Sequence, residues 1–119
     1  MIYKNSFKRL LVILRTSSES TENLSVDLIN RQITKNDLLI KCSEVPFFKT
    51  LERAYEIAYD KKYFWTLMID ADVLINSRSI ENIIALGTKN KNFLVIQGYV
   101  LDYLYGGPRS GGLHLYSYE

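Results

Sequence analysis

The sequence predicts an α/β fold in which a mostly parallel sheet carries helices on both faces. Two observations lead to this prediction: continuous apolar runs of strand length alternate with amphipathic segments of helical length, and 47% of the 119 residues are hydrophobic. Alternation of this kind favours crossover connections between parallel strands. We expect one domain spanning residues 1–119, because the composition supplies a single core.

The first unit is a strand followed by a helix. Residues 9–14 (Arg-Leu-Leu-Val-Ile-Leu) form an uninterrupted apolar run, which is typical of a strand buried on both faces. The next segment, Thr16-Ser17-Ser18-Glu19, has the spacing of a capping box and predicts that a helix starts there. In that helix we expect Leu24, Leu28 and Ile33 to point inward.

The second unit begins with a short strand over residues 37–42. Pro46 is placed to open the next helix, because proline lacks only an amide hydrogen that would be unpaired at a helix start. The apolar positions of this helix recur at helical spacing, which predicts one inward face. These positions are Phe48, Leu51, Ala54, Tyr55 and Ala58.

The third unit is a strand over residues 64–69 and a helix that starts after Asn76-Ser77. That helix is expected to bury three isoleucines and to end at Gly87. A fourth strand is expected over residues 93–100. Beyond Gly98, tyrosines and a glycine cluster predict an extended, turn-rich segment and no further crossover unit. The isoleucines are Ile80, Ile83 and Ile84.

Charge and cysteine content restrict the function classes. The net charge is +2, from 15 basic and 13 acidic side chains that are interspersed, so neither nucleic acid nor a membrane surface is an expected partner. The longest apolar runs are far shorter than the ~20 residues of a membrane span. Cys42 is the single cysteine and cannot form an internal disulfide. These features predict a cytoplasmic protein without a transmembrane segment.

Two carboxylates directly follow the third strand. Asp70 and Asp72 flank Ala71 between two apolar tripeptides, where a carboxylate is costly unless a cation or hydrogen-bond donors compensate it. In parallel sheets ligands bind at the carboxyl ends of strands. Asp70 and Asp72 are expected to point to the same side, with Ala71 small enough to let a ligand approach. Mg²⁺ or Mn²⁺ suits such oxygen ligands, and a bound diphosphate would complete the shell. The alternative is that one aspartate caps the following turn and the other is solvated.

The segment Phe64 to Ile75 (Phe-Trp-Thr-Leu-Met-Ile-Asp-Ala-Asp-Val-Leu-Ile), together with the preceding helix Leu51 to Tyr59, resembles the core of GT-A fold glycosyltransferases, especially glycosyltransferase family 2. The resemblance covers residues 9 to 116. It implies a nucleotide-diphospho-sugar transferase fold of Rossmann type. It also implies that Asp70 and Asp72 hold a divalent metal, Mn²⁺ or Mg²⁺, and that one of them reaches the donor ribose.

The resemblance extends to residues that would bind the nucleotide-sugar. The loop after the first strand touches the nucleotide in that family, and here it carries Arg15, Thr16 and Ser17. After the second strand, where many members have an acidic pair, this chain has Cys42-Ser43-Glu44, so Glu44 takes that place. Lys49 and Arg53 are four residues apart on one helix and would face the phosphates, or they belong to a solvated helix face.

Two residues near the carboxyl end complete the predicted site. His114 follows a pair of glycines, and in position it resembles the late histidine that completes the metal site in many GT-A enzymes. The alternative for His114 is a strand histidine bonded to the backbone. Asp102 is the one acid between Phe93 and Tyr118 and is the candidate general base for an acceptor hydroxyl.

The predicted function is metal-dependent transfer of a sugar from a nucleotide-sugar donor to a glycan, lipid or protein acceptor. The first alternative is a non-catalytic or partial nucleotide-binding module, because the chain stops at Glu119 while still strand-like, as a domain truncated at its carboxyl end would. The second alternative is a phosphatase of the haloacid dehalogenase type, whose Asp-x-Asp follows the first strand. Here two strand–helix units precede the motif.

Overall fold

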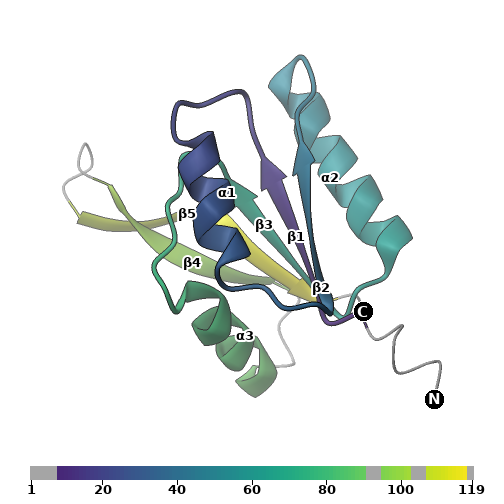
Figure 1. Cartoon of the computed structure of the whole chain (residues 1–119), viewed down its shortest axis with the longest axis vertical. Helices are drawn as coiled ribbons and strands as arrows, with labels where there is room; N and C mark the ends of the chain where they lie inside the picture. Colours follow the sequence, from purple (N-terminus) through teal and green to yellow (C-terminus); the bar gives the residue numbers. More distant parts are fainter. Residues whose placement is uncertain (1–7, 91–94, 103–106, 118–119) are drawn as a thin grey trace.

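A computed structural model of the chain describes residues 8–90, 95–102 and 107–117, with side chains described for 8–90 and 113–117. Strands and helices alternate up to the last helix, and two strands follow it (Figure 1). The elements are β1 (Leu10–Arg15), α1 (Glu22–Asn30), β2 (Asp37–Cys42), α2 (Phe47–Lys61), β3 (Trp65–Asp70), α3 (Ser79–Lys89), β4 (Val95–Asp102) and β5 (Gly107–Ser117).

The described strands form one five-stranded mixed sheet in the order β2-β1-β3-β5-β4. β1 pairs in parallel with both β2 and β3, whereas β5 pairs antiparallel with β3 and with β4. Four strands therefore run in one direction and β5 runs against them. The predicted α/β class with a mostly parallel sheet is confirmed. β4 overlaps the strand expected over residues 93–100, and the extended segment expected after Gly98 includes the end of β4 and all of β5.

Both faces of the sheet are covered by helices (Figure 1). On one face α1 and α3 pack over Leu10, Val12 and Leu14 of β1, and on the other face α2 packs over Leu11 and Ile13. All six residues of β1 are buried, which confirms the prediction from its apolar run. No helix among the described residues is long and apolar enough to cross a bilayer.

The inward face of α1 differs from the prediction. Leu28 is partly buried against the core, but Leu24 is 49% exposed, and the buried positions of the helix are Ser25 and Ile29. Ile33 is partly buried too, but it lies beyond the end of the helix at Asn30. The helix begins only at Glu22, later than the capping-box pattern indicated. The small Ser25 side chain lets the helix approach the chain segment that follows β3, where its hydroxyl donates to the Val73 carbonyl at 3.5 Å.

The inward face of α2 is also rotated from the predicted one. Ala54 is buried and Ala58 is partly buried, as predicted, but Phe48 is 58% exposed and Tyr55 is 50% exposed. Thr50 takes the buried place instead. The helix therefore rests on β1 and β2 through small side chains, and its aromatic residues point away from this contact.

Gly87 does not end α3, which continues to Lys89. The glycine lies inside the helix and is buried, and a Cβ there would lie 2.8 Å from Leu115 Cδ2 and 3.0 Å from Trp65 Cη2. Its missing side chain lets α3 lie close against β3 and β5. The predicted burial of Ile80 and Ile83 is confirmed.

Candidate functional site

Asp70 is the last residue of β3, one residue beyond the predicted strand end at Ile69. The five preceding residues of the strand are buried, and the alternation of the strand directs Asp70 to the sheet face that carries α2. The strand ladder continues one residue further, because the Ala71 amide donates to the Arg15 carbonyl at 2.9 Å. Asp70 is thus held at the carboxyl edge of the sheet by backbone pairing.

Arg15 and Asp70 form an ion pair across the β1–β3 pair. They are register partners, and Arg15 Nε donates to Asp70 Oδ1 at 2.8 Å. The Arg15 side chain is 7% exposed and the Asp70 side chain 30%. Burial raises the pKa of Asp70 and the nearby Asp72 charge adds to this effect, while the Arg15 charge and hydrogen bond oppose it. The carboxylate is therefore poorly solvated even with its guanidinium partner.

Ala71 has a different role from the predicted one. Its side chain is buried in the core on the α1 and α3 face, and its carbonyl accepts a hydrogen bond from Thr21 Oγ1 at 2.7 Å. The alanine is small because it packs in the core, so the expectation that it leaves room for a ligand is wrong. Asp72 follows in an exposed turn. Its charge still contributes to the raised pKa of Asp70.

His114 lies on β5, the strand next to β3, and its register partner there is Met68. Its Nδ1 is buried and has no hydrogen-bond partner within the part of the chain that the structure describes. Burial and the Arg15 charge lower the pKa of His114, whereas Asp70 raises it. A buried ring nitrogen without a partner is unusual and suits a site that binds a ligand. The structure thus brings His114, Arg15 and Asp70 to one region.

The chemistry of these side chains fits a hard divalent cation, because carboxylate oxygens and imidazole nitrogen are among its ligands. No group of three or more His, Cys, Asp and Glu side chains that could hold a metal is assembled within the described residues. Mg²⁺ is usually bound by one or two carboxylates together with substrate phosphates. The metal ligands Asp70, Asp72 and His114 remain a prediction.

The loop after β1 is organised by Thr16. The Thr16 hydroxyl lies 3.1 Å from Glu19 Oε1 and 2.6 Å from Glu22 Oε1, and the Ser17 amide donates to Glu19 at 2.7 Å. The predicted contact between Thr16 and Glu19 exists, but it closes a turn, because α1 starts only at Glu22. Ser17 is exposed at this edge. Glu22 also pairs with Lys41 at 3.2 Å, a contact that joins residues 19 apart and has no local sequence signal.

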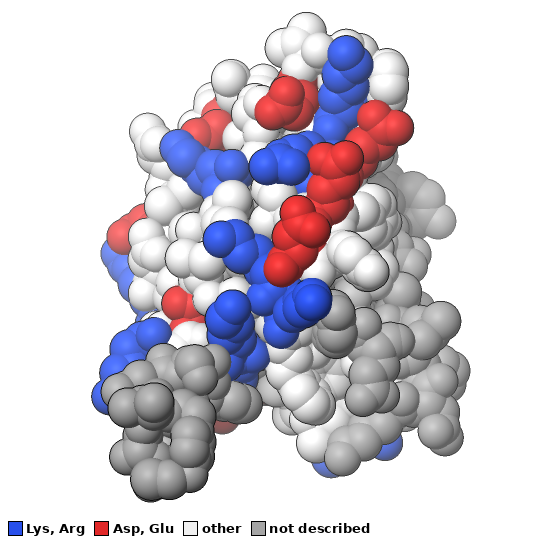
Figure 2. Space-filling model, turned by 90° about the vertical axis from the view of Figure 1, so that its right-hand side faces the viewer, with Lys and Arg blue, Asp and Glu red and all other residues white. Residues whose placement is uncertain are grey.

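Glu44, Lys49 and Arg53 lie on the exposed surface of the β2–α2 region. The backbone of Glu44 holds Thr50, since its amide donates to Thr50 Oγ1 at 2.7 Å. Arg53 pairs with Glu56 at 3.2 Å, with both side chains more than half exposed. Figure 2 shows basic and acidic side chains interspersed on this side of the molecule. In this structure Arg53 therefore belongs to a solvated helix face, which is the alternative that the sequence offered for it.

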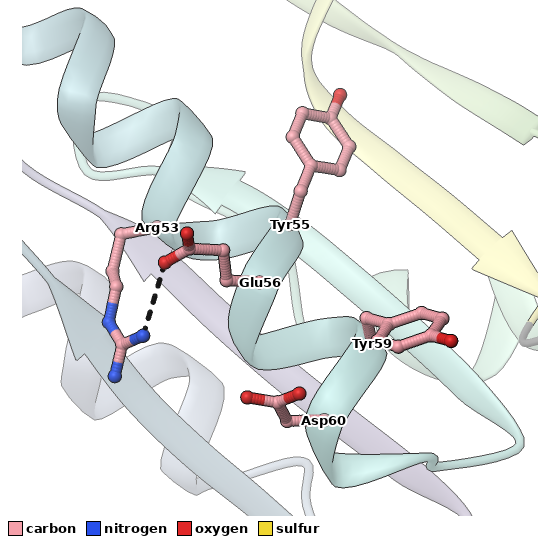
Figure 3. A pocket seen from close by; sticks show the side chains of 5 residues that line it. All are labelled: Arg53, Tyr55, Glu56, Tyr59 and Asp60. Carbon is pink, nitrogen blue, oxygen red and sulfur yellow. Dashed lines mark hydrogen bonds and ion pairs between the residues drawn. The ribbon is translucent and has the colours of Figure 1, made fainter.

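The exposed face of α2 also borders an open hollow (Figure 3). All of its lining residues come from this one helix, and in Figure 3 their side chains point in different directions. The hollow includes none of Asp70, Asp72 and His114. Its lining residues are Arg53, Tyr55, Glu56, Tyr59 and Asp60.

Tyr116 lies beside His114 and pairs with Tyr55, a pairing that the sequence did not indicate. The Tyr55 and Tyr116 hydroxyls are 2.9 Å apart, and their rings meet edge to face with centroids 5.8 Å apart. The Tyr116 and His114 ring centroids are 6.3 Å apart. Tyr116 and His114 are two residues apart on β5, so they share a face of the strand. This contact connects α2 to the region of His114.

Asp102 is the last residue of β4 and is paired with Gly107 of β5. The backbone register places it beyond the level of Asp70, two strands away in the sheet order. Its side chain lies outside the described residues, so its predicted role as general base stays a prediction.

The fold and the site define a small α/β chain with a mixed, mostly parallel sheet and with ionisable side chains gathered at the carboxyl edge of its central strands. No protein-family model matches the chain, and no curated protein matches its sequence. Among solved structures it is similar to the crystal structure of A197 from STIV, with a TM-score of 0.67 and 16% identity. The match covers 92% of this chain and 64% of A197, so the chain spans about two thirds of the length of that protein. At this identity the likeness shows a shared fold alone.

Proposed function

We propose that the chain is a metal-dependent glycosyltransferase of the GT-A type, similar to glycosyltransferase family 2, that uses a nucleotide-sugar donor. The observation that carries the proposal is the grouping of Asp70 and Arg15, at the carboxyl ends of β3 and β1, with His114 of the antiparallel neighbour β5, whose Nδ1 has no partner among the described residues. Ligands of open α/β sheets bind at this edge. The order β2-β1-β3-β5-β4 with β5 antiparallel supports the proposal by placing a histidine strand next to the aspartate strand.

Each residue at this edge has a stated role in the proposal. Asp70, Asp72 and His114 hold Mn²⁺ or Mg²⁺, which supplies neutralisation of the charge that develops on the nucleoside diphosphate leaving group. Arg15 donates to phosphate oxygens, and Thr16 and Ser17 border the nucleotide. Asp102 removes the proton of the acceptor hydroxyl on a glycan, lipid or protein. Glu44, in the connection before α2, and Lys49 and Arg53, on α2, contact the nucleotide-sugar in this proposal.

Thermal melting tests the binding part of this proposal. Mn²⁺ together with a panel of nucleoside diphosphates should raise Tm, because a ligand that binds only the folded state stabilises it. At a hundredfold excess over Kd the gain is roughly 10 °C for a chain of this size. Asp72→Asn should abolish this shift with little effect on Tm alone, since Asp72 is exposed. Asp60→Asn, an exposed acid of α2, is the matched control and should keep the shift.

Turnover separates the proposal from its alternatives. Transfer of a labelled sugar to an acceptor, or slow hydrolysis of the donor, is expected with Mn²⁺ and is lost in Asp72→Asn. Asp102→Asn should lower the transfer rate and keep the Mn²⁺-dependent rise in Tm. A melting shift without turnover would identify a binding module, and phosphate release from phosphomonoesters would identify a phosphatase. No melting shift with any nucleoside diphosphate would refute the proposal.

A further inference from the structure

The position of Arg15 is fixed on both sides of its strand. β1 lies between β2 and β3, and the register pairs Arg15 with Cys42 on one side and with Asp70 on the other. The Arg15 side chain is almost fully buried, and its Nε donates to Asp70 Oδ1 at 2.8 Å. A guanidinium is charged at every accessible pH, so a buried one requires an anionic partner at all times.

This requirement affects cation binding by Asp70. A carboxylate that already holds a buried guanidinium is a poor ligand for a second cation, since the two positive charges repel each other at short range. Asp70 becomes a good metal ligand only when Arg15 has another anion to bind. A phosphate group meets this need, because guanidinium binds phosphate through parallel hydrogen bonds.

We propose that Arg15 is a counter-ion switch, which holds Asp70 in the absence of donor and transfers to the diphosphate when the donor binds, so that Asp70 takes up a divalent cation only together with a diphosphate. This inference rests on the proposed function, because it assigns a binding order to the same site. Linkage makes the effect reciprocal: the cation and the diphosphate each raise the affinity of the site for the other. In the absence of the donor, the divalent cation therefore binds to this site only weakly.

The first test replaces the switch residue. Arg15→Met removes the charge and keeps much of the apolar stem, so Mn²⁺ alone should bind at least tenfold more tightly than to the wild-type protein. The complex of Mn²⁺ with inorganic pyrophosphate should bind at least tenfold more weakly. Electron paramagnetic resonance, which detects free Mn²⁺, measures the affinity for Mn²⁺ in the absence and in the presence of pyrophosphate, compared at the same concentration of free Mn²⁺. Arg9→Met is the matched control: it breaks the ion pair with Asp37 at the opposite edge of β1 and should leave both affinities unchanged.

The second test releases the same guanidinium from its partner. Asp70→Asn keeps the shape of the side chain and removes its charge, so the variant tests the switch even if Arg15→Met does not fold. Titration calorimetry with pyrophosphate in the presence of a chelator should show at least fivefold tighter binding to Asp70→Asn than to the wild-type protein. Added Mn²⁺ should no longer improve this binding.

The outcomes separate the switch from the proposed function. The switch is wrong and the proposed function stands under one combination of results. The wild-type protein binds Mn²⁺ with pyrophosphate, but Arg15→Met gains no affinity for Mn²⁺ alone and Asp70→Asn gains none for pyrophosphate alone. If the wild-type protein does not bind Mn²⁺ with pyrophosphate at all, both proposals are wrong. A gain of affinity in either variant, with Arg9→Met unchanged, supports the switch.

Discussion

Arg9 and Asp37 form a two-point ion pair where β2 begins, with Nε 3.0 Å from Oδ1 and Nη2 2.6 Å from Oδ2. Asp37 also accepts hydrogen bonds from the Thr34 amide at 2.8 Å and the Thr34 hydroxyl at 3.2 Å. Burial raises the pKa of Asp37, but the hydrogen bonds from Arg9 and Thr34 and the charge of Arg9 outweigh it, so the pKa lies below its ordinary value. This ion pair links the start of β1 to the start of β2, at the edge of the sheet opposite the candidate site.

Asp37→Asn should therefore lower the free energy of unfolding by about 1–3 kcal/mol at neutral pH, measured by urea denaturation. The contribution of an acid with a lowered pKa is present above its unfolded-state pKa of about 4 and is lost as pH falls through the folded-state pKa. The difference between wild type and variant should thus shrink below about pH 4. Asp27→Asn, which breaks an exposed pair on α1, is the control and should change stability by less than about 0.5 kcal/mol.

Gly87→Ala should destabilise the protein although alanine is the better helix former. Helix propensity alone would favour alanine by about 1 kcal/mol. The added methyl group would lie 2.8 Å from Leu115 Cδ2 and 3.0 Å from the Trp65 ring, so α3 must shift away from the sheet. We expect a net loss of about 1–2 kcal/mol in chemical denaturation. In a Leu115→Ala background the same substitution should cost less, and equal costs in the two backgrounds would contradict the steric explanation.

Tyr116 should titrate late among the nine tyrosines of the chain. Burial and the hydrogen bond with Tyr55 raise the pKa of Tyr116 to about 12. The neutral phenol is favoured in the folded state, so its contribution to stability is complete below the unfolded-state pKa of about 10 and is lost as pH rises toward about 12.

Tyr116→Phe should remove this alkaline component from the stability profile, and its ultraviolet titration should lack the latest phenol step. Tyr55→Phe should move that step to lower pH, because it removes the hydrogen bond between the two hydroxyls. Tyr59→Phe, on the exposed face of α2, is the control. A late step that persists in Tyr116→Phe would show that another tyrosine has the raised pKa.

His114 is the only histidine, so a single imidazole signal in an NMR titration reports its pKa. That pKa should lie below its ordinary value, since burial and the Arg15 charge both disfavour the imidazolium. Asp70→Asn should lower it further, and Arg15→Met should raise it. A lowered histidine pKa means that the unfolded chain binds more protons, so stability should fall as pH drops below about 6.5. Leu115 is buried on the sheet face that carries α1 and α3, so the control Leu115→Ile should leave the pKa of His114 unchanged.

The apolar strands and the place of Asp70 could be predicted from sequence because they depend on local pattern. A continuous apolar run identifies β1 and β3 as buried strands. Ligands of such sheets bind at the carboxyl ends of the strands, so a carboxylate that follows an apolar strand is a candidate site residue. The inward face of α2 could be predicted only in part: Ala54 was expected to be buried, but Thr50 was not, and Tyr55 stays at the surface. Hydrophobic periodicity ranks the larger residue as the buried one.

The partner of Asp70 could not be predicted for a different reason. Arg15 lies 55 residues away in sequence, and its pairing depends on the register between β1 and β3, which no short motif encodes. The sequence placed Arg15 in a loop that touches nucleotide, whereas the structure makes it the last residue of a strand. Likewise, sequence alone indicates that Gly87 ends a helix. Its packing role depends on Trp65 and Leu115, which lie far from it in sequence and close to it in the fold.

The insertion of β5 between β3 and β4 has a consequence for the order in which the chain can fold. β3 has both of its neighbours only when the last described strand has paired with it, through contacts such as Leu113 with Ile69. During synthesis β1, β2 and β3 leave the ribosome first, and β3 then has an open edge until β5 arrives. His114 and Tyr116 lie on that same strand, so the site is assembled only after β5 has paired with β3.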